Sequence, residues 1–261
     1  RTKIIHHGTH LEGNDLNLSE VEQILDPVLL QGTVPDRNSR LQVEKGSSAD
    51  EGTVPNGTQI PARDRDIQEI INYRSVMDYI DTLAPFTPGV KGAHTPGVFA
   101  PTLTRHILFE VHRLTVASLL PEGESGHYRS VKVVIRNTDT HEITFRPPSP
   151  TEVPFLIDDL FAWLGSEEGK AVHPLLRAGI LHYELVRIHP FTDGNGRTAR
   201  AMALLLLFLE GYEVKKFFAL EEYYDNHPEE YYGALQSVVG SGELTTWLEY
   251  FTLGIAIEFN R

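Results

Sequence analysis

The sequence predicts a mainly α-helical protein with one small β-hairpin. Apolar residues recur at helical spacing over residues 67–83 and again over 103–120. Residues 197–209 are rich in Ala, Leu and Met, which are strong helix formers. Residues 131–135 and 142–145 instead form two short runs around a turn-prone Asn-Thr-Asp-Thr segment, as in a hairpin. These observations indicate a helical bundle that carries a small β-element.

The N-terminal part is predicted to combine helices with long loops. A capping box at residues 19–22, Ser-Glu-Val-Glu, predicts a helix that ends near Leu30. The polar stretch 31–66 follows, where we expect a loop or a β-excursion. A second loop is predicted over 85–101, in which Thr-Pro-Gly occurs twice, and the helix over 103–120 then begins the central part of the chain.

Further helices are predicted in the second half of the chain. Residues 149–152 combine a capping box with proline at the first helical position, and this helix should end near Leu164. A helix over 171–188 leads to His189. Beyond the apolar segment that follows, we expect helices over 228–239 and 244–259.

Composition limits the class of protein. A length of 261 residues suits one large or two small domains. The formal net charge of −13 argues against binding duplex nucleic acid, which relies on Lys and Arg at phosphates. The absence of cysteine excludes disulfides and thiol catalysis and suits a reducing compartment. No apolar run approaches the length of a membrane span. We therefore expect a cytoplasmic protein without nucleic-acid or membrane partners.

One run concentrates the residues that can do chemistry, His-Pro-Phe-Thr-Asp-Gly-Asn-Gly-Arg-Thr-Ala-Arg from His189 to Arg200. Its glycines precede the helix predicted from Arg197, where free backbone N–H groups and the helix dipole favour an anion. Arg197 and Arg200 lie three residues apart, roughly on one helix face, and can clamp several oxygens of a polyphosphate.

Two other groups in the run suggest a reaction. Asp193 would repel a bound phosphate unless a divalent cation such as Mg²⁺ bridges the two. His189 is the one group in the run that exchanges a proton near pH 7, so it is the candidate base for an attacking hydroxyl. The alternative is a simple loop in which Gly-Asn-Gly is a turn and the arginines cap or pair. An EF-hand is excluded, since Leu204 would occupy its last ligand position.

The run resembles the signature of Fic-domain proteins, His-Pro-Phe-x-Asp/Glu-Gly-Asn-Gly-Arg-x-x-Arg, and matches every fixed position. The resemblance implies a Fic fold, a helical bundle with a β-hairpin flap. Its parts would be an N-terminal region with an inhibitory segment (1–102), the core (103–209) and helices that complete the nucleotide site (210–261). It also implies transfer of AMP from Mg-ATP to a Ser, Thr or Tyr hydroxyl of a target protein. Gly196 stands where the Doc-like kinases carry Lys, which favours nucleotidyl over phosphoryl transfer.

The resemblance assigns a role to each residue of the motif. These roles are His189 as the base, Phe191 as a core anchor, Asp193 on the metal, Gly194, Asn195 and Gly196 as the anion-binding nest, and Arg197 and Arg200 on the distal phosphates. An extended segment of the target would pair with the flap, and Gly126–Arg129 resembles the Gly-x-x-Arg that precedes it. A hairpin that only covers core is the alternative.

Tyrosines in the C-terminal part resemble the adenine contacts of the family. Tyr231 and Tyr232 fall at the expected position, and adjacent residues on a helix point about 100° apart, so we expect one of them to stack. Tyr223 and Tyr224 form a rival pair. Val239 stands where the family often has Asn, which leaves base selectivity open. Core packing is the alternative for all four tyrosines.

Near the N-terminus, Leu-Glu-Gly-Asn around Glu12 resembles the inhibitory segment of some Fic proteins, whose Glu pairs with the second motif arginine, here Arg200. A carboxylate there would occupy the guanidinium that should hold the γ-phosphate. The family has Ser or Thr where this chain has Gly8. Glu51 is a rival by spacing, but it lies in a stretch without helical periodicity. A zinc site at His6, His7 and His10 is disfavoured, since their spacing fits no standard structural zinc set.

Several functions stay open at this stage. The site could remove AMP, with Glu12 positioning a water, or use another nucleotide or phosphodiester donor. A regulator that binds ATP without turnover is the non-enzymatic alternative. The expected partners are ATP and a target protein, and the sequence is compatible with a homodimer.

Overall fold

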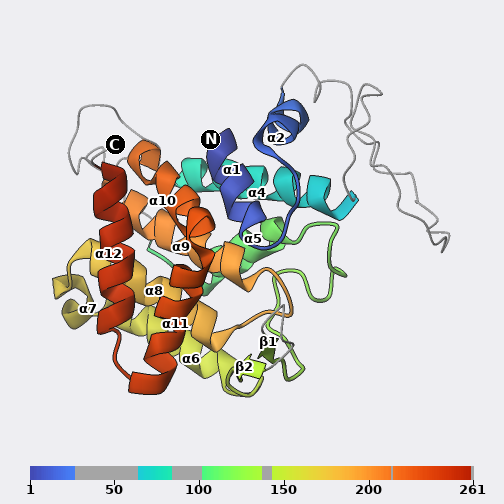
Figure 1. The fold of residues 1–261 in the computed structure, drawn as a ribbon. Coiled ribbons are helices and arrows are strands. Elements are labelled where there is room, and N and C mark those ends of the chain that lie inside the picture. Colours follow the sequence, from blue (N-terminus) through green and yellow to red (C-terminus); the bar gives the residue numbers. More distant parts are fainter. Residues whose placement is uncertain (27–63, 84–101, 137–142, 213, 260–261) are drawn as a thin grey trace.

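The computed structural model describes residues 1–26, 64–83, 102–136, 143–212 and 214–259, which form a mostly helical molecule with a two-stranded sheet (Figure 1). The elements in chain order are α1 (Thr2–His10), α2 (Leu18–Leu25), α4 (Asp64–Leu83), α5 (Arg105–Thr115), β1 (Ile135–Arg136), β2 (Ile143–Phe145), α6 (Val153–Gly165), α7 (Glu167–Ala171), α8 (Pro174–Ile188), α9 (Asn195–Leu209), α10 (Val214–Asn226), α11 (Pro228–Ser241) and α12 (Thr245–Phe259). The predicted fold class, mainly helical with one small hairpin, is confirmed.

The centre of the molecule is the pair α8 and α9, joined by the loop that holds the motif. Most of α9 is buried, including Ala201, Met202, Leu205 and Leu206, as expected of a helix enclosed on most sides. Helix α5 packs against α9, and α12 packs against α8 and α10. Because α9 is enclosed, its N-terminus is a fixed platform at which the motif loop ends.

The N-terminal helices cover this platform. Helix α1 packs against α10 and α4, and its Ile4 and Ile5 are each 1% exposed (Figure 1). The last turn of α1 therefore lies close to the start of α9, although the two are far apart in sequence. In the described part of the chain, no helix is both long and apolar enough to cross a membrane.

The hairpin forms as predicted but is shorter. Strands β1 and β2 pair antiparallel, with Ile135 opposite Phe145 and Arg136 opposite Ile143. Residues 131–134, predicted as strand, lie outside it. The connecting turn falls outside the described residues.

The predicted start of α2 is wrong by two residues. The cap is Asn17, whose Oδ1 accepts from the Glu20 backbone N at 3.1 Å while a Glu20 carboxylate oxygen accepts from the Asn17 backbone N at 2.7 Å. Asn is as good a cap as Ser and stands one turn before the Glu that completes this box. The helix ends at Leu25, because Asp26 is extended (ψ 123°), so its predicted end near Leu30 is wrong. Glu51 and the predicted loops over 31–63 and 85–101 lie outside the described residues.

Other predicted helix boundaries are also wrong, and the local backbone conformation gives the reason. Helix α5 ends at Thr115 rather than near residue 120, and Ser118 is left-handed with φ 62°. The helix predicted over 171–188 begins at Pro174 instead, because Pro174 keeps His173 extended (ψ 135°), and Ala171 ends the separate short helix α7. Helix α6 begins at Val153 with Pro154 in its first turn, after the Ser149–Glu152 turn.

Four further helix boundaries differ from their predicted positions. Helix α9 begins at Asn195, two residues before its predicted start, and α4 begins at Asp64 rather than residue 67. Helix α11 continues to Ser241 and α12 begins at Thr245. Helix α10 was not predicted at all.

Candidate active site

The motif loop begins and ends at left-handed residues. His189 caps α8 with φ 51° and ψ 60°, and Gly194 caps the start of α9 with φ 74°. A left-handed conformation costs a non-glycine residue about 1–2 kcal/mol, so packing must hold His189 in place. Its conformation turns the chain sharply out of α8 and keeps the imidazole beside the start of α9.

Asn195 closes the loop with both ends of its amide. Its Nδ2 donates to the Phe191 backbone O and its Oδ1 accepts from the Phe191 backbone N, each at 2.9 Å. Phe191 is fully buried and stacks on His112, with ring centroids 3.6 Å apart. The Asn195 side chain therefore shapes the loop, and its backbone N–H is left at the start of α9.

His112, which the sequence analysis did not select, fixes the loop from α5. Its Nδ1 accepts from the Gly126 backbone N at 3.0 Å, so its Nε2 carries the proton and donates to the Asp193 carbonyl at 3.0 Å. Burial lowers the pKa of His112 to about 4, which keeps the ring neutral.

Arg129 ties the flap to the motif. Its guanidinium donates to the backbone carbonyls of His189 (2.7 Å), Val131 (3.0 Å) and Pro148 (2.7 Å), and its backbone N donates to the Pro190 carbonyl at 2.9 Å. One side chain thus joins the end of α8 to both segments that flank the hairpin.

His189 is prepared to accept a proton at one nitrogen. Its Nδ1 contacts the Val186 carbonyl at 3.3 Å, so Nδ1 carries the proton and Nε2 keeps its lone pair. Burial lowers the pKa of the imidazole, and the Arg129 cation adds to this, while the Glu12 and Asp193 carboxylates oppose it. The neutral, basic form therefore dominates near pH 7.

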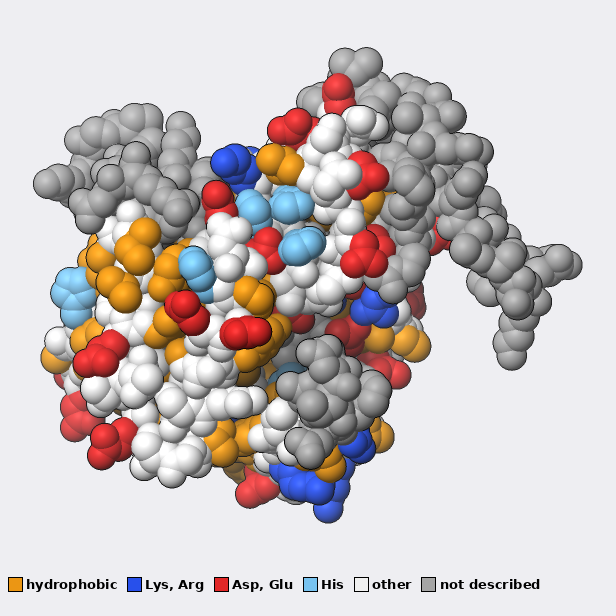
Figure 2. Space-filling model, viewed as in Figure 1, with side chains coloured by type: hydrophobic (Ala, Val, Ile, Leu, Met, Phe, Trp, Pro, Cys, Tyr) orange, Lys and Arg blue, Asp and Glu red, His pale blue; other side chains and the backbone are white. Residues whose placement is uncertain are grey.

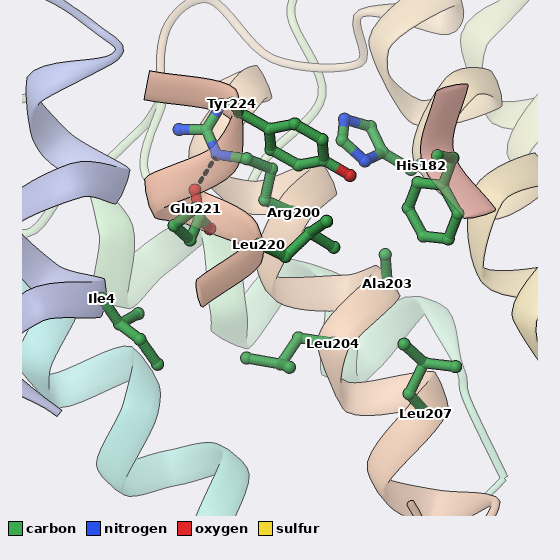
Figure 3. A pocket seen from close by; sticks show the side chains of 10 residues that line it. Ile4, His182, Arg200, Ala203, Leu204, Leu207, Leu220, Glu221 and Tyr224 are labelled. Atoms are coloured by element: carbon green, nitrogen blue, oxygen red, sulfur yellow. Dashed lines mark ion pairs between the residues drawn. The ribbon is translucent and has the colours of Figure 1, made fainter. Parts of the chain in front are cut away.

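Arg200 is buried between two carboxylates. Its side chain is 2% exposed; Nη1 lies 2.8 Å from Glu12 and Nε lies 2.8 Å from Glu221, and Nη2 donates to the Gly8 carbonyl at 2.8 Å. Figure 3 shows Arg200 and Glu221 beside a pocket with a mostly apolar lining between α1, α9 and α10. In such surroundings a guanidinium requires compensating charge.

The Glu12 carboxylate also lies against the start of α9. A Cβ at Gly196 would collide with it, so the carboxylate approaches the backbone where an anion was expected to bind. Gly8 is required by packing for a similar reason, because a Cβ there would lie 2.6 Å from the Tyr73 ring. A larger side chain at position 8 would therefore displace Tyr73 or α1.

Asp193 and Arg197 are paired to α4. Arg65 donates to one Asp193 oxygen at 2.6 Å, and the Gly194 backbone N donates to the other at 2.6 Å. Glu69 lies 3.3 Å from Arg197, whose side chain is 2% exposed. Burial opposes ionisation of Asp193, but Arg65 and Arg197 outweigh it and lower the pKa of the carboxyl.

A known protein family matches the central part of this chain. The sequence model of the Fic/DOC family matches residues 102–207, which include α5, the hairpin, α8 and most of α9. Residues 102–207 form a Fic domain.

Curated relatives share this Fic domain. The protein adenylyltransferase Fic of Culex quinquefasciatus is 27% identical over 250 residues, covering 94% of this chain and 38% of the relative. That of Drosophila grimshawi is 28% identical over 208 residues, covering 80% of this chain and 33% of the relative. The chain thus spans less than two fifths of the length of either relative.

Solved structures show the same fold. A Fic family protein from Desulfovibrio desulfuricans superposes with a TM-score of 0.68 at 23% identity, covering 99% of this chain and 63% of that one. Fic-1 of C. elegans superposes with a TM-score of 0.65 at 23% identity, and the match covers 100% of this chain and 61% of that one. The predicted Fic fold is therefore confirmed.

The four tyrosines of the C-terminal part differ in their exposure to solvent. Tyr231 is 2% exposed and its hydroxyl pairs with His182 Nε2 at 2.9 Å, whereas Tyr232 is 45% exposed and its hydroxyl contacts the Leu11 carbonyl at 3.3 Å. Tyr223 and Tyr224 are 8% and 1% exposed. Tyr232 is thus the most exposed of the four.

The structure brings the predicted groups His189, Asp193, Arg197, Arg200 and Glu12 together at the start of α9. Sequence analysis missed the charges that balance them, Arg65 and Glu69 on α4 and Glu221 on α10. Their partners are distant in sequence, so no local pattern pointed to them.

We expect His112 to make folding pH-dependent. Its folded pKa of about 4 lies below the ordinary value near 6.5, so the unfolded state binds the extra proton and stability falls as pH drops through that window. Between pH 7 and 5 the loss from this group should be about 2 kcal/mol. Urea unfolding of His112→Phe, which keeps the stacking, should give a less stable protein with a flatter pH dependence. An unchanged slope would contradict the assignment.

We also expect Gly8→Ala to weaken the docking of α1. The added Cβ would clash with Tyr73 and should cost about 1–3 kcal/mol. Hydrogen exchange of the α1 amides should speed up relative to the α9 amides. Gly123→Ala is the matched control, because a Cβ there meets nothing within 4 Å; equal effects of the two changes would disprove the close-packing argument.

Proposed function

We propose that this chain transfers AMP from ATP to a Ser, Thr or Tyr hydroxyl of a target protein, and that Glu12 restrains the reaction. The observation that supports this most directly is the meeting of Arg197, Arg200 and His189 at the glycine-lined N-terminus of α9. This combines an anion site with a base. The names of the curated relatives agree with it.

The polyphosphate would bind at the start of α9. The free N–H groups of its first turn, with Gly194 and Gly196 leaving the backbone accessible, suit phosphate oxygens. Arg197 and Arg200 would contact the distal phosphates once Glu69 and Glu12 give way. Tyr232, with its exposed ring, would stack on the adenine.

Asp193 is a suitable ligand for Mg²⁺. It offers a carboxylate that the Arg65 cation now neutralises, and Mg²⁺ prefers one or two carboxylates together with phosphate oxygens. When bound, Mg²⁺ would neutralise phosphate charge and favour departure of pyrophosphate. Arg65 would release the Asp193 oxygen it now contacts.

His189 would act as the general base. Its Nε2 takes the proton of the target hydroxyl, the hydroxyl oxygen bonds to the α-phosphorus, and the bond from that phosphorus to the bridging oxygen of pyrophosphate breaks. An extended segment of the target would pair with the flap, whose position Arg129 ties to the His189 backbone.

Glu12 would restrain transfer by competing for Arg200. While its carboxylate holds Nη1, that guanidinium nitrogen cannot hold the γ-phosphate, and ATP would bind in an unproductive pose. If the Glu12 carboxylate is removed, Glu221 still balances the charge of the buried Arg200, so the site should stay folded.

We expect α-³²P-ATP with Mg²⁺ to label the chain or added target proteins more strongly after Glu12→Ala than in the wild type. Adding His189→Ala should reduce the signal by about 10²–10⁴-fold, because the base acts in the chemical step, while ATP binding persists. EDTA should abolish labelling.

Glu22→Ala on α2 is the matched control, since it removes an exposed carboxylate that lies outside the site. Labelling that survives His189→Ala would disprove the base. If no variant is labelled although ATP binds, the result would favour a regulator that binds ATP without turnover. Release of AMP from a premodified target that requires Glu12 would favour the reverse reaction.

The rate should also depend on pH in a defined direction. Because the pKa of His189 is lowered, its base form persists below the ordinary value near 6.5. Single-turnover transfer by Glu12→Ala should stay flat from pH 8 to about 6.5 and fall only in more acidic solution. An acidic limb with its midpoint above pH 7 would contradict this.

A further inference from the structure

A histidine cluster lies on the side of α1 that meets α10, away from the start of α9. His7 Nδ1 is 2.8 Å from one oxygen of Asp225 and His10 Nδ1 is 2.7 Å from the other. The centroid of the His6 ring lies 4.6 Å from that of His7 and 5.5 Å from that of His10. Figure 2 shows histidine side chains gathered on this face, in the region of α1 in Figure 1.

Three of these groups converge as metal ligands do. One ligand atom each from His6, His7 and Asp225 lies within 4.8 Å of the others. The Nδ1 of His6 is buried and makes no hydrogen bond. A buried nitrogen without a partner is costly unless something binds it, which sets this cluster apart from an ordinary surface ion pair.

The cluster thus offers two imidazole nitrogens and a carboxylate oxygen, the donor types that hold a transition-metal ion.

We propose that His6, His7 and Asp225 bind a divalent transition-metal ion of the Zn²⁺ class. Imidazole ligands suit Zn²⁺, Ni²⁺ or Cu²⁺, whereas Mg²⁺ and Ca²⁺ take oxygen ligands. His10 holds the second oxygen of Asp225 and orients the carboxylate, as outer hydrogen bonds do at metal sites. A zinc site was disfavoured because the spacing of the histidines fits no standard structural zinc set. The sequence could not reveal the further ligand Asp225, which α10 supplies.

The position of the site gives the ion a consequence that rests on the proposed function. His6 and His7 belong to the helix that carries Gly8 and precedes Glu12, and Asp225 lies one turn beyond Glu221 on α10. A bound ion would link these two helices and hold α1 docked. It would therefore strengthen the restraint of Glu12 on Arg200, since a ligand favours the state that binds it.

The binding test does not depend on activity. The EDTA-stripped full chain is titrated with Zn²⁺ against a chromophoric chelator, in excess Mg²⁺ to occupy Asp193. We expect one equivalent to bind, with affinity lowered at least about tenfold by His7→Ala and by Asp225→Asn. His6→Phe, which keeps the ring shape, should do the same without unfolding the helix.

His106→Ala is the matched control, because His106 is an exposed histidine on α5. Bound Co²⁺ should give visible absorption bands that the three site variants lose and His106→Ala keeps. Binding that is absent, or equal in Asp225→Asn and the wild type, would overturn the site.

The regulatory consequence is tested separately with the labelling assay. Zn²⁺ should lower the residual labelling by the wild-type chain and leave that by Glu12→Ala unchanged. Zinc binding without any effect on wild-type labelling would overturn the regulatory role. If no variant transfers AMP, the proposed function fails while the titration still decides the metal site.

Discussion

The arrangement of this Fic domain depends on the buried guanidinium of Arg200. Its side chain is 2% exposed beside an apolar pocket, so its charge must be balanced within the protein (Figure 3). Removing one partner of a buried ion pair typically costs about 3–5 kcal/mol. Glu221 and Glu12 supply the balance from α10 and from the segment after α1, and Gly8 adds a carbonyl. The docking of α1 and the segment after it is therefore coupled to the charge of Arg200 on α9.

The same rule applies to the other charges of the motif. Arg197 is paired with Glu69, and Asp193 with Arg65. Each group expected to meet the nucleotide or its metal is thus neutralised by an internal group of the sign that the ligand would bring. The phosphates would replace Glu69 and Glu12 at the arginines, and the cation would replace Arg65 at Asp193. Neither ligand would enter a site whose charges lack partners. Binding would exchange one set of ion pairs for another, which keeps the desolvation cost of the buried arginines covered in both states.

The fold class, the Fic fold and the position of the motif were accessible from sequence because they depend on local patterns. Helical periodicity and the unbroken spacing of the motif residues need no knowledge of distant contacts. Helix α10 was missed, and with it Glu221 and Asp225. Gly8 packs against Tyr73, 65 residues away in the chain, and no local pattern could indicate that contact. Arg65 and Glu69 lie on α4, a helix that was predicted largely correctly. Their pairing with Asp193 and Arg197 of the motif could not be predicted. Pairing across the fold is decided by packing, which a single sequence does not display.

The motif loop itself is held by groups that do not take part in this exchange of charge. His112 is neutral and bonds two backbone groups, Asn195 bonds only the backbone of Phe191, and Arg129 bonds only carbonyls. None of these contacts requires Glu12, Glu69 or Arg65. The loop geometry should therefore persist when the internal ion pairs are replaced, so that His189 keeps its orientation while its surroundings change. With backbone hydrogen bonds fixing the loop and ion pairs that can be exchanged, the proposed base would stay preorganised while the proposed anion site opens or closes around it.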